Sequence, residues 1–387
     1  MNSTFGDEHM SFYTKLAAYI TYLMEDRSHS LADQPVLALL KGLSAVYRYG
    51  VVRRFTAYAR HPERQAHLAA KVISLGNITA GGTGKTPTAC MLAQWLQRQG
   101  YRVALLNRGY RSAAEHGAAI MSDGKDVLLS AQEGGDEALL LARSLPGIPV
   151  LVGRGRAQTG QLAIDRFHSQ VLLLDDAFQH WQLARDLDIV LIDATNPFGN
   201  GALLPRGILR EPVSHLSRAG FFIITKADQR TEADKQAIYA VLTRYNSTAP
   251  VAEAVHRPAW CVSFAAWYEA KADRHTCEQL PHQAVIAVSA LGNPASFEAT
   301  VTACGYTLAG NLRFDDHHQY TNDDLSVMIQ MAAEKKAVLV TTEKDAVKLP
   351  ASFILQHDVP LWVLGIEIVI EKGKEELQNV ILQHIGE

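Results

Sequence analysis

The sequence has 387 residues, of which 48% are hydrophobic and 20% charged, and its formal net charge is −3. This composition is too apolar for a disordered chain and lacks the positive charge typical of nucleic-acid binders, so we expect a globular protein with no nucleic-acid partner. Four widely spaced cysteines, with no C-x-x-C pair, exclude a disulfide scaffold and a zinc ribbon and fit a reducing cytosol. We expect neither a membrane-spanning stretch nor a signal peptide, and the length predicts two or three domains.

The segment 35–72 departs from this average because it carries seven basic residues and one acid. Its apolar and aromatic residues recur at steps of three and four, which predicts one apolar helical face. A basic helix with tyrosines suits the surface of an anionic membrane, but the spacing alone favours a helix packed on the body with a solvated basic back. The predicted apolar face comprises Val36, Leu40, Leu43, Tyr47, Val51, Phe55 and Tyr58.

Beyond residue 70, short apolar runs alternate with helical periodicity, which is typical of a parallel sheet covered by helices on both faces. We expect an α/β fold with an N-terminal helical segment (1–66), a core (67–228) and a second, smaller α/β domain (229–387). Strands are predicted at 72–75, 103–106, 150–152, 171–174, 189–192, 221–224, 285–288, 338–341 and 361–363, and helices near 137–145, 294–303 and 323–334.

The strongest local motif is a glycine-rich run at 80–86, Ala-Gly-Gly-Thr-Gly-Lys-Thr, between a predicted strand and helix. Such loops turn backbone N–H groups toward phosphate oxygens, and the helix N-terminus adds its dipole. Thr79 stands where the G-x-x-x-x-G-K-[ST] pattern has glycine, and the run resembles the shorter G-G-x-G-K-[ST] variant. Lys85 would reach the β- and γ-phosphates and Thr86 would bind Mg²⁺. The sequence therefore predicts a P-loop nucleoside triphosphate site formed by Gly81, Gly82, Thr83, Gly84, Lys85 and Thr86.

Two carboxylates, Asp175 and Asp176, follow the apolar run 171–174, at the sheet edge where α/β folds place their ligands. We expect one of them to hold the Mg²⁺ shell, directly or through water, and the sequence leaves open which. The run Thr225-Lys226-Ala227-Asp228 has the form of the guanine-binding [NT]-K-x-D loop of GTPases. It keeps a P-loop GTPase or ATPase switch as an alternative function, although such short matches are common among surface residues at strand ends.

Further short motifs follow one another along the chain. They are Gly76-Asn77-Ile78, Gly81 to Pro87, Arg108-Gly109-Tyr110, Gly135-Asp136-Glu137, Asp175 to His180, Leu183 to Asp188, Leu204-Pro205, Leu209 to Pro212, Phe314 to His318 and Tyr320. In this order they resemble the tetraacyldisaccharide 4′-kinase family, the lipid A 4′-kinases of Gram-negative bacteria. The resemblance spans roughly residues 41–348. Its departures are small: Asn107 and Ala177 stand where the family usually has serine and glycine, and Gly134 precedes Gly135.

The resemblance implies a kinase that uses ATP and Mg²⁺ to phosphorylate the 4′-hydroxyl of a tetraacyl disaccharide 1-phosphate, giving lipid IVA. It implies that Asp136 is the catalytic carboxylate, paired with a histidine of the Asp-His-His segment. We assign that role to His317, with His318 as the other candidate, and count Lys85 among the catalytic residues. The resemblance also implies that Arg210 and Glu211 lie near the nucleotide phosphates and the metal, and that Gln179 shapes the cleft.

A lipid acceptor changes the favoured interpretation of the basic segment 35–72 from a helix packed on the body to a helix at the membrane. We therefore expect the helix over residues 35–60 to contact the membrane, with the protein peripheral to the cytoplasmic face of the bacterial inner membrane and without an obligate protein partner. The sequence leaves open the roles of Arg108 and Tyr110, the acyl-chain preference, the oligomeric state and the domain orientation.

Overall fold

The computed structural model describes residues 12–24, 26, 30–269, 284–291, 294–315, 318–357 and 359–386. The strands are β1 Lys71–Gly76, β2 Val103–Asn107, β3 Ala119–Ser122, β4 Val150–Val152, β5 Val171–Leu174, β6 Leu187–Asp193, β7 Phe221–Thr225, β8 Val251–Ser263, β9 Ala284–Ser289, β10 Thr307–Arg313, β11 Val338–Thr342 and β12 Leu361–Lys372. The helices are α1 Phe12–Met24, α2 Gln34–Arg60, α3 Lys85–Arg98, α4 Ala131–Gly134, α5 Asp136–Ser144, α6 Arg156–Phe167, α7 Glu232–Tyr245, α8 Phe264–Tyr268, α9 Pro294–Ala303, α10 Asn322–Lys335, α11 Glu343–Ala346, α12 Ala351–Gln356 and α13 Lys374–Gly386.

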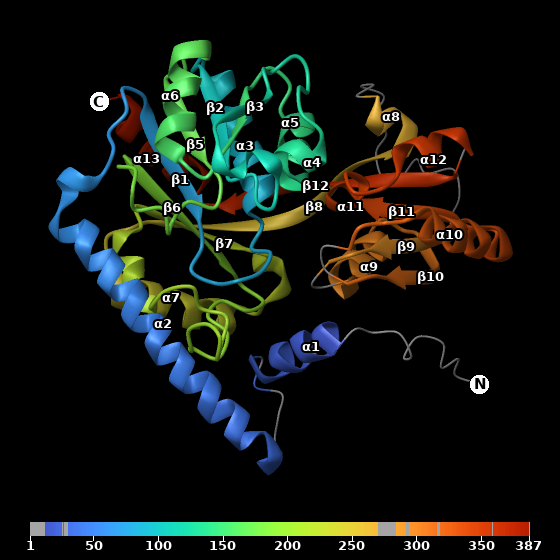
Figure 1. Cartoon of the computed structure of the whole chain (residues 1–387), viewed down its shortest axis with the longest axis horizontal. Helices are drawn as coiled ribbons and strands as arrows, with labels where there is room; N and C mark the ends of the chain where they lie inside the picture. The colour runs from blue at the N-terminus through green and yellow to red at the C-terminus, as the bar shows by residue number, and fades with distance from the viewer. Residues whose placement is uncertain are drawn as a thin grey trace.

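The strands form one twelve-stranded sheet in the order β10-β9-β11-β12-β8-β7-β6-β1-β5-β2-β4-β3 (Figure 1). Neighbouring strands in this sheet run parallel, except for the antiparallel pairs β12 with β8 and β3 with β4. The predicted α/β class is therefore confirmed. From β7 to β4 all neighbours run parallel, so their carboxyl ends meet along one edge.

All nine predicted strands are present, but β3, β8 and β10 were not predicted. Strand β8 escaped because Glu253, His256, Arg257 and Pro258 interrupt its apolar pattern. Strand β10 was missed because most of its side chains are partly or fully exposed, so it has no apolar run. Strand β12 is longer than the predicted 361–363, and its later residues include the charged Glu367, Glu371 and Lys372.

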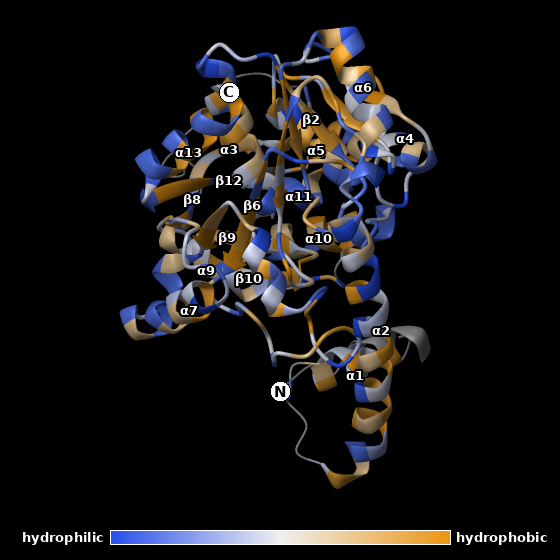
Figure 2. Ribbon diagram, turned by 90° about the vertical axis from the view of Figure 1, so that its left-hand side faces the viewer, coloured by the Kyte–Doolittle hydropathy of each residue, from blue (hydrophilic) through white to orange (hydrophobic). Residues whose placement is uncertain are grey.

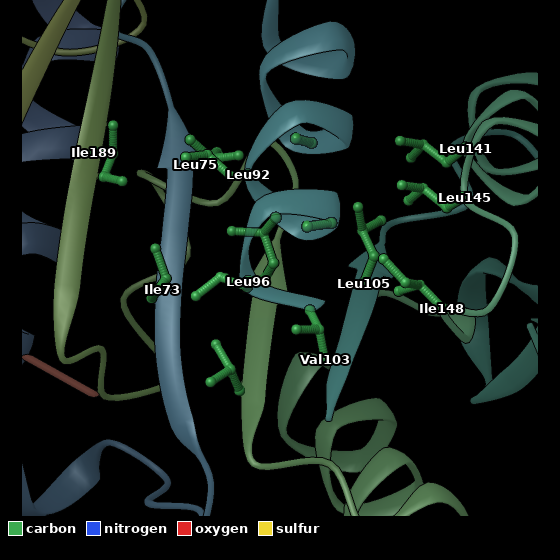
Figure 3. Close-up of a cluster of buried hydrophobic side chains, with 14 of the residues drawn as sticks. Ile73, Leu75, Leu92, Leu96, Val103, Leu105, Leu141, Leu145, Ile148 and Ile189 are labelled. Carbon is green, nitrogen blue, oxygen red and sulfur yellow. The ribbon is translucent and has the colours of Figure 1, made fainter. Parts of the chain in front are cut away.

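Alternate side chains of the central strands enter cores on opposite faces of the sheet. Ile73 and Leu75 of β1 pack in one core with Leu92 and Leu96 of α3 (Figure 3). Val72 belongs to a core on the α6 side. Helices α3, α5 and α13 cover the first face, and α6 and α7 the second. Burying an apolar side chain of this size contributes about 1.5–3 kcal/mol, so these layers fix the sheet edge that carries the loops.

The remaining strands, β9 to β11, pack with α8, α9, α10 and α12 in two further cores. The long strands β8 and β12 pair with each other along their length and join this part to the rest of the sheet (Figure 1). The last residues of β12, together with α13, pack against the α3 face and not with β9 to β11.

Helix α2 lies along the body and its N-terminal end projects beyond it (Figure 1, Figure 2). The side of α2 that packs on the body includes part of the predicted apolar face. Ser44 Oγ donates a hydrogen bond to the carbonyl oxygen of Leu203 at 2.9 Å, and Tyr47 Oη donates to that of Arg210 at 2.9 Å. Phe55 packs its ring 4.3 Å from that of His215. No helix in the described part of the chain is long and apolar enough to cross a membrane.

Candidate active site

The glycine-rich run forms a loop between β1 and α3, as the motif predicts. Gly81 and Gly84 have φ values of 114° and 84°, a region that favours glycine because a Cβ would be strained there. Gly81 and Gly82 are exposed, whereas the Lys85 side chain is mostly buried. The loop is anchored at its start, where the Ala80 N–H donates to the carbonyl oxygen of Ile208 at 2.7 Å.

Asp176 contacts two cationic side chains from separate segments. Arg210 Nη1 donates to Asp176 Oδ1 at 2.6 Å, and Lys85 Nζ lies 3.8 Å from the same oxygen. Burial raises the pKa of Asp176, but Lys85 and Arg210 outweigh it and leave the pKa below its usual value. Asp176 is therefore ionised at neutral pH and lies beside the P-loop lysine.

Asp175 has a different environment from its neighbour. Its Oδ2 accepts a hydrogen bond from Asn107 Nδ2 at 3.0 Å, while its Oδ1 is buried with no hydrogen-bond partner among the described residues. Burial raises the pKa of Asp175 to about 7, with added repulsion from Glu137 and Asp176. A buried carboxylate oxygen without a partner is costly unless a cation or proton binds it.

This pair fits a magnesium ion that arrives with a nucleotide. No cluster of three or more His, Cys, Asp or Glu side chains able to hold a metal occurs in the described part of the chain. Mg²⁺ commonly uses one or two carboxylates, waters and the substrate phosphates, so it does not need a complete protein cage. The free oxygen of Asp175, the ionised Asp176 and Thr86 in the first turn of α3 match that donor set.

Asn77, at the end of β1, links these groups. Its Oδ1 accepts hydrogen bonds from Lys85 Nζ at 3.4 Å and from Arg210 Nη1 at 3.3 Å. Its main-chain carbonyl accepts one from Gln179 Nε2 at 2.8 Å. The buried Asn77 therefore contacts both cations through its side chain and the glutamine through its main chain.

Glu211 is fully buried in a network of its own. Gln179 Nε2 donates to its Oε1 at 2.6 Å, and His215 Nδ1 and Arg218 Nη1 each lie 2.8 Å from its Oε2. Burial raises the pKa of Glu211, but the hydrogen bonds from His215 and Arg218 outweigh it and leave the pKa low. Glu211 reaches the Asp176 group through Gln179 and Asn77.

A buried guanidinium bonds to the main chain beside the acidic pair. Arg156, in the first turn of α6, donates from Nη2 to the main-chain carbonyl of Asp175 at 3.1 Å and from Nη1 to that of Gly153 at 2.8 Å. Burial lowers its pKa to about 10, so it stays charged at neutral pH. Nearby, burial and Arg156 lower the pKa of His180 to about 3, so this imidazole is neutral.

Asp136 opens α5, and the segment after β10 approaches it. Gln319 Nε2 lies 3.4 Å from Asp136 Oδ2. His318 Nε2 instead lies 3.0 Å from Asp324 Oδ2, and its ring stacks on Phe314. The assigned residue, His317, lies outside the described residues.

Sequence inspection did not assign roles to Asn77, Asn107, Arg156 or Arg218. Asn77 and Asn107 stand at the ends of β1 and β2, and Arg156 follows β4, at the same sheet edge as Asp175. The rule that ligands bind beyond the carboxyl ends of parallel strands could have found these three. Arg218 had no such signal, because it ends the 3-10 helix Val213–Arg218 that precedes β7 and so does not follow the carboxyl end of a strand.

A family model described as tetraacyldisaccharide-1-P 4′-kinase matches residues 36–386. The chain belongs to this family. A tetraacyldisaccharide 4′-kinase of Halothermothrix orenii is 40% identical over 376 residues, covering 95% of this chain and 97% of the relative. A tetraacyldisaccharide 4′-kinase of Syntrophus aciditrophicus is 38% identical over 368 residues, covering 93% and 96%. The resemblance inferred from the short motifs is thus confirmed, and this protein is a kinase.

A solved structure of this family has the same fold. The LpxK protein of Aquifex aeolicus, whose crystal structure is in complex with ATP, superposes with a TM-score of 0.72 at 27% identity, covering 90% of this chain and 99% of that one. Membership of the 4′-kinase family does not favour the GTPase or ATPase switch that Thr225 to Asp228 had kept as an alternative.

Proposed function

We propose that this chain transfers the γ-phosphate of ATP to the 4′-hydroxyl of a tetraacyl disaccharide 1-phosphate, giving lipid IVA. The observation that carries the proposal is the convergence of Lys85, Arg210 and the Asp175–Asp176 pair at one sheet edge, in a chain of the 4′-kinase family. Phosphoryl transfer depends mainly on positioning and on neutralised charge, and this cluster supplies both.

Each group has a role in that reaction. The P-loop N–H groups and Lys85 bind the β- and γ-phosphates, and Arg210 holds the γ-phosphate as negative charge moves toward the leaving ADP. Thr86, Asp175 and Asp176 would hold Mg²⁺, which neutralises charge on the phosphates when it is bound. Glu211 and Gln179 keep Asn77 and Arg210 in place through their hydrogen bonds.

Asp136 acts as the base toward the acceptor. As the 4′-oxygen bonds to the γ-phosphorus and the bond to ADP breaks, the hydroxyl proton passes to the Asp136 carboxylate. His317 orients this carboxylate or shares its proton, and Gln319, two residues later, supports the pairing because it already contacts Asp136. His318 is the weaker candidate because Asp324 and Phe314 engage its ring.

Helix α2 contacts the membrane that holds the acceptor. Besides the side that packs on the body, α2 has an exposed apolar stripe of Leu39, Leu43 and Val46, with Leu39 62% and Val46 70% exposed. Exposed Lys41, Arg48 and Arg53 lie along the same helix. A helix that exposes both apolar and basic side chains binds anionic bilayers at the interface, and Arg53 lies on the side of the apolar stripe. The protein is thus peripheral to the cytoplasmic face of the inner membrane.

The two halves of the sheet form two domains that meet at the active site. Gln319 comes from the part with β9 to β11, whereas Asp136 belongs to the P-loop part, and β8 and β12 join the two. Nucleotide binding draws them together and excludes water from the phosphate. Small-angle scattering with a non-hydrolysable ATP analogue tests this, and an unchanged radius of gyration would count against it.

The proposed reaction is tested by transfer of labelled phosphate from ATP to a tetraacyl disaccharide 1-phosphate in detergent micelles. We expect labelled lipid with ATP and Mg²⁺, and little with GTP. A substrate with its 4′-position already phosphorylated is the matched control. Hydrolysis of nucleotide without labelled lipid would overturn the proposal.

A further inference from the structure

The Thr225-to-Asp228 motif has no part in the proposed reaction, yet its first two residues contact the P-loop. Thr225 is fully buried at the end of β7, and its Oγ1 donates a hydrogen bond to the carbonyl oxygen of Thr83 at 3.0 Å. Lys226 Nζ lies 3.4 Å from the carbonyl oxygen of Gly82. Both contacts join residues more than 140 positions apart in the chain.

Lys226 is held in this position by its own partners. Its Nζ pairs with the Asp193 carboxylate at the end of β6. The other oxygen of Asp193 accepts hydrogen bonds from the Thr195 N–H at 2.8 Å and from Thr195 Oγ1 at 2.6 Å, so the carboxylate is fixed. Lys226 also has a φ of 54°, which only a well-determined turn maintains in a non-glycine residue.

The P-loop depends on such contacts because its outer part has little packing. A Cβ added at Gly81 or Gly82 would meet no atom within 4 Å, so no neighbouring side chain restrains these two residues there. Glycine also has more backbone freedom than any other residue, which makes the ordered loop entropically costly. Hydrogen bonds to the loop's carbonyl groups remain to fix its conformation.

The carbonyl groups of the loop are available to accept hydrogen bonds from neighbouring segments. A phosphate-binding loop turns its N–H groups toward the anion, which leaves carbonyl oxygens directed elsewhere and in need of donors. Gly84, the next glycine, is packed closely: a Cβ there would lie 2.7 Å from His256 Nε2 on β8. Burial and Lys226 lower the pKa of His256, so this contact adds no charge to the loop.

We propose that Thr225 and Lys226 are positioning residues that hold the Gly82 and Thr83 carbonyls, and with them the P-loop N–H groups, in the phosphate-binding arrangement. The motif thus acts on the phosphates of the nucleotide and not on its base. Asp228, the residue that would bind a guanine in the GTPase pattern, is exposed and is not required. The proposal rests on nucleotide binding by the P-loop and does not depend on the identity of the phosphate acceptor.

Equilibrium binding of ATP with Mg²⁺ tests it without the acceptor. Thr225→Val keeps the shape but removes the donor, and Lys226→Met removes the ammonium group. We expect each to weaken ATP binding about tenfold, which is the order of effect expected from losing one hydrogen bond to the loop. Adenosine binding is expected to stay unchanged, because it has no phosphate. Thr225→Ser restores the hydroxyl and is expected to restore the wild-type affinity for ATP, and Asp228→Asn should match the wild type.

Two results would overturn this inference: wild-type ATP affinity in both Thr225→Val and Lys226→Met, or equal losses for ATP and adenosine. Thermal unfolding of each variant detects general destabilisation, and if Thr225→Val fails to fold, Lys226→Met and Thr225→Ser decide the question. Failure of lipid phosphorylation by the wild-type protein would sink the proposed reaction and leave this binding pattern intact.

Discussion

Arg210 and Lys85 share a single carboxylate oxygen, Asp176 Oδ1, at 2.6 Å and 3.8 Å. The arginine comes from a loop 34 residues after Asp176 and the lysine from the P-loop, so one side chain holds two cationic groups from distant segments, both of which we propose to bind phosphate. This carboxylate thus serves two purposes, since it is also a predicted ligand of Mg²⁺. The positions of Lys85 and Arg210 are therefore coupled to metal binding through the charge of Asp176.

Asp176→Asn removes the shared charge but keeps the size of the side chain. We expect kcat to fall at least a hundredfold, because the metal loses a ligand and the two cations lose their common anchor. Steady-state phosphorylation of the lipid acceptor measures it, with Asp165→Asn, on the exposed side of α6, as the matched control. A kcat within threefold of the wild-type value would show that Asp176 is not part of the active site.

Substitution of the proposed base pair separates chemistry from nucleotide binding. Asp136→Asn and His317→Ala are each expected to lower kcat by two or more orders of magnitude and to leave ATP affinity unchanged, since neither residue contacts the P-loop in the proposed mechanism. His318→Ala is expected to have the smaller effect. Near-normal turnover for Asp136→Asn, or a larger loss for His318→Ala than for His317→Ala, would refute the respective assignment.

The exposed stripe of α2 is tested by vesicle sedimentation. Leu39→Gln with Val46→Gln removes apolar contact, and Arg48→Glu with Arg53→Glu reverses charge. Each pair is expected to shift the protein from the pellet of phosphatidylglycerol-containing vesicles to the supernatant. In the wild type, the contribution of Arg48 and Arg53 to vesicle binding should weaken as salt is added, whereas that of Leu39 and Val46 should not. Arg53 is preferable to Arg54 because Arg54 stacks over Trp181.

The exposed Arg98 at the end of α3 supplies the matched charge control for that experiment. Arg98→Glu reverses one charge on another part of the protein, as Arg53→Glu alone does on α2, and is expected to leave sedimentation unaltered. Equal losses for Arg98→Glu and Arg53→Glu would mean that net charge, and not α2, governs membrane binding.

Glu253 makes the stability of the sheet dependent on pH. Burial raises its pKa, but hydrogen bonds from Lys235, Tyr239 and Lys372 outweigh it and lower the pKa below that of the unfolded chain. A lowered pKa stabilises the fold above the unfolded value, near 4.3, and this stability is lost as the pH falls through the folded value. We therefore expect the free energy of unfolding to decrease as the pH drops below about 4.3.

Glu253→Gln is expected to cost about 1–3 kcal/mol at pH 7, because it leaves Lys235 without its buried partner. The difference from the wild type should shrink progressively as the pH falls below about 4.3 and through the lowered pKa of the folded state, since the wild-type carboxylate then becomes protonated. Urea unfolding between pH 3.5 and pH 8 measures this. Glu232→Gln, at the exposed partner of Lys235, should change little. A constant difference across the pH range would contradict the assignment.

The sequence was sufficient where local pattern and structure coincide. The apolar runs before the P-loop and before Asp175 became β1 and β5, because strands buried on both faces need apolar side chains throughout. The positions of Asp175 and Asp176 followed from the same rule. By contrast, β8 carries buried charge at Glu253, whose partners Lys235, Tyr239 and Lys372 come from α7 and β12 and are not visible in the local pattern.

The strand-end rule could have marked Asn107 and Arg156 as candidates, but their contacts with Asp175 were not predictable from the local pattern. The roles of Asn107 and Arg156 depend on which strands are neighbours: β5 lies between β1 and β2, and β4 follows β2. That order places the ends of β2 and β4 beside Asp175, although 68 residues separate Asn107 from it. For α2 the spacing predicted one apolar face, but Tyr47 and Phe55 pack on the body, and the exposed stripe runs through Leu39 and Val46.

The packing of α13 sets an order of events during synthesis. Leu377, Ile381 and Ile385 are buried in the same core as Leu92 and Leu96 of the helix that follows the P-loop. That core cannot close until residues 374–386 have emerged from the ribosome, whereas the cores around β9 to β11 use residues that emerge earlier. The nucleotide-binding half, although translated first, is therefore the last to be completed, and part of this core stays exposed on the growing chain until then.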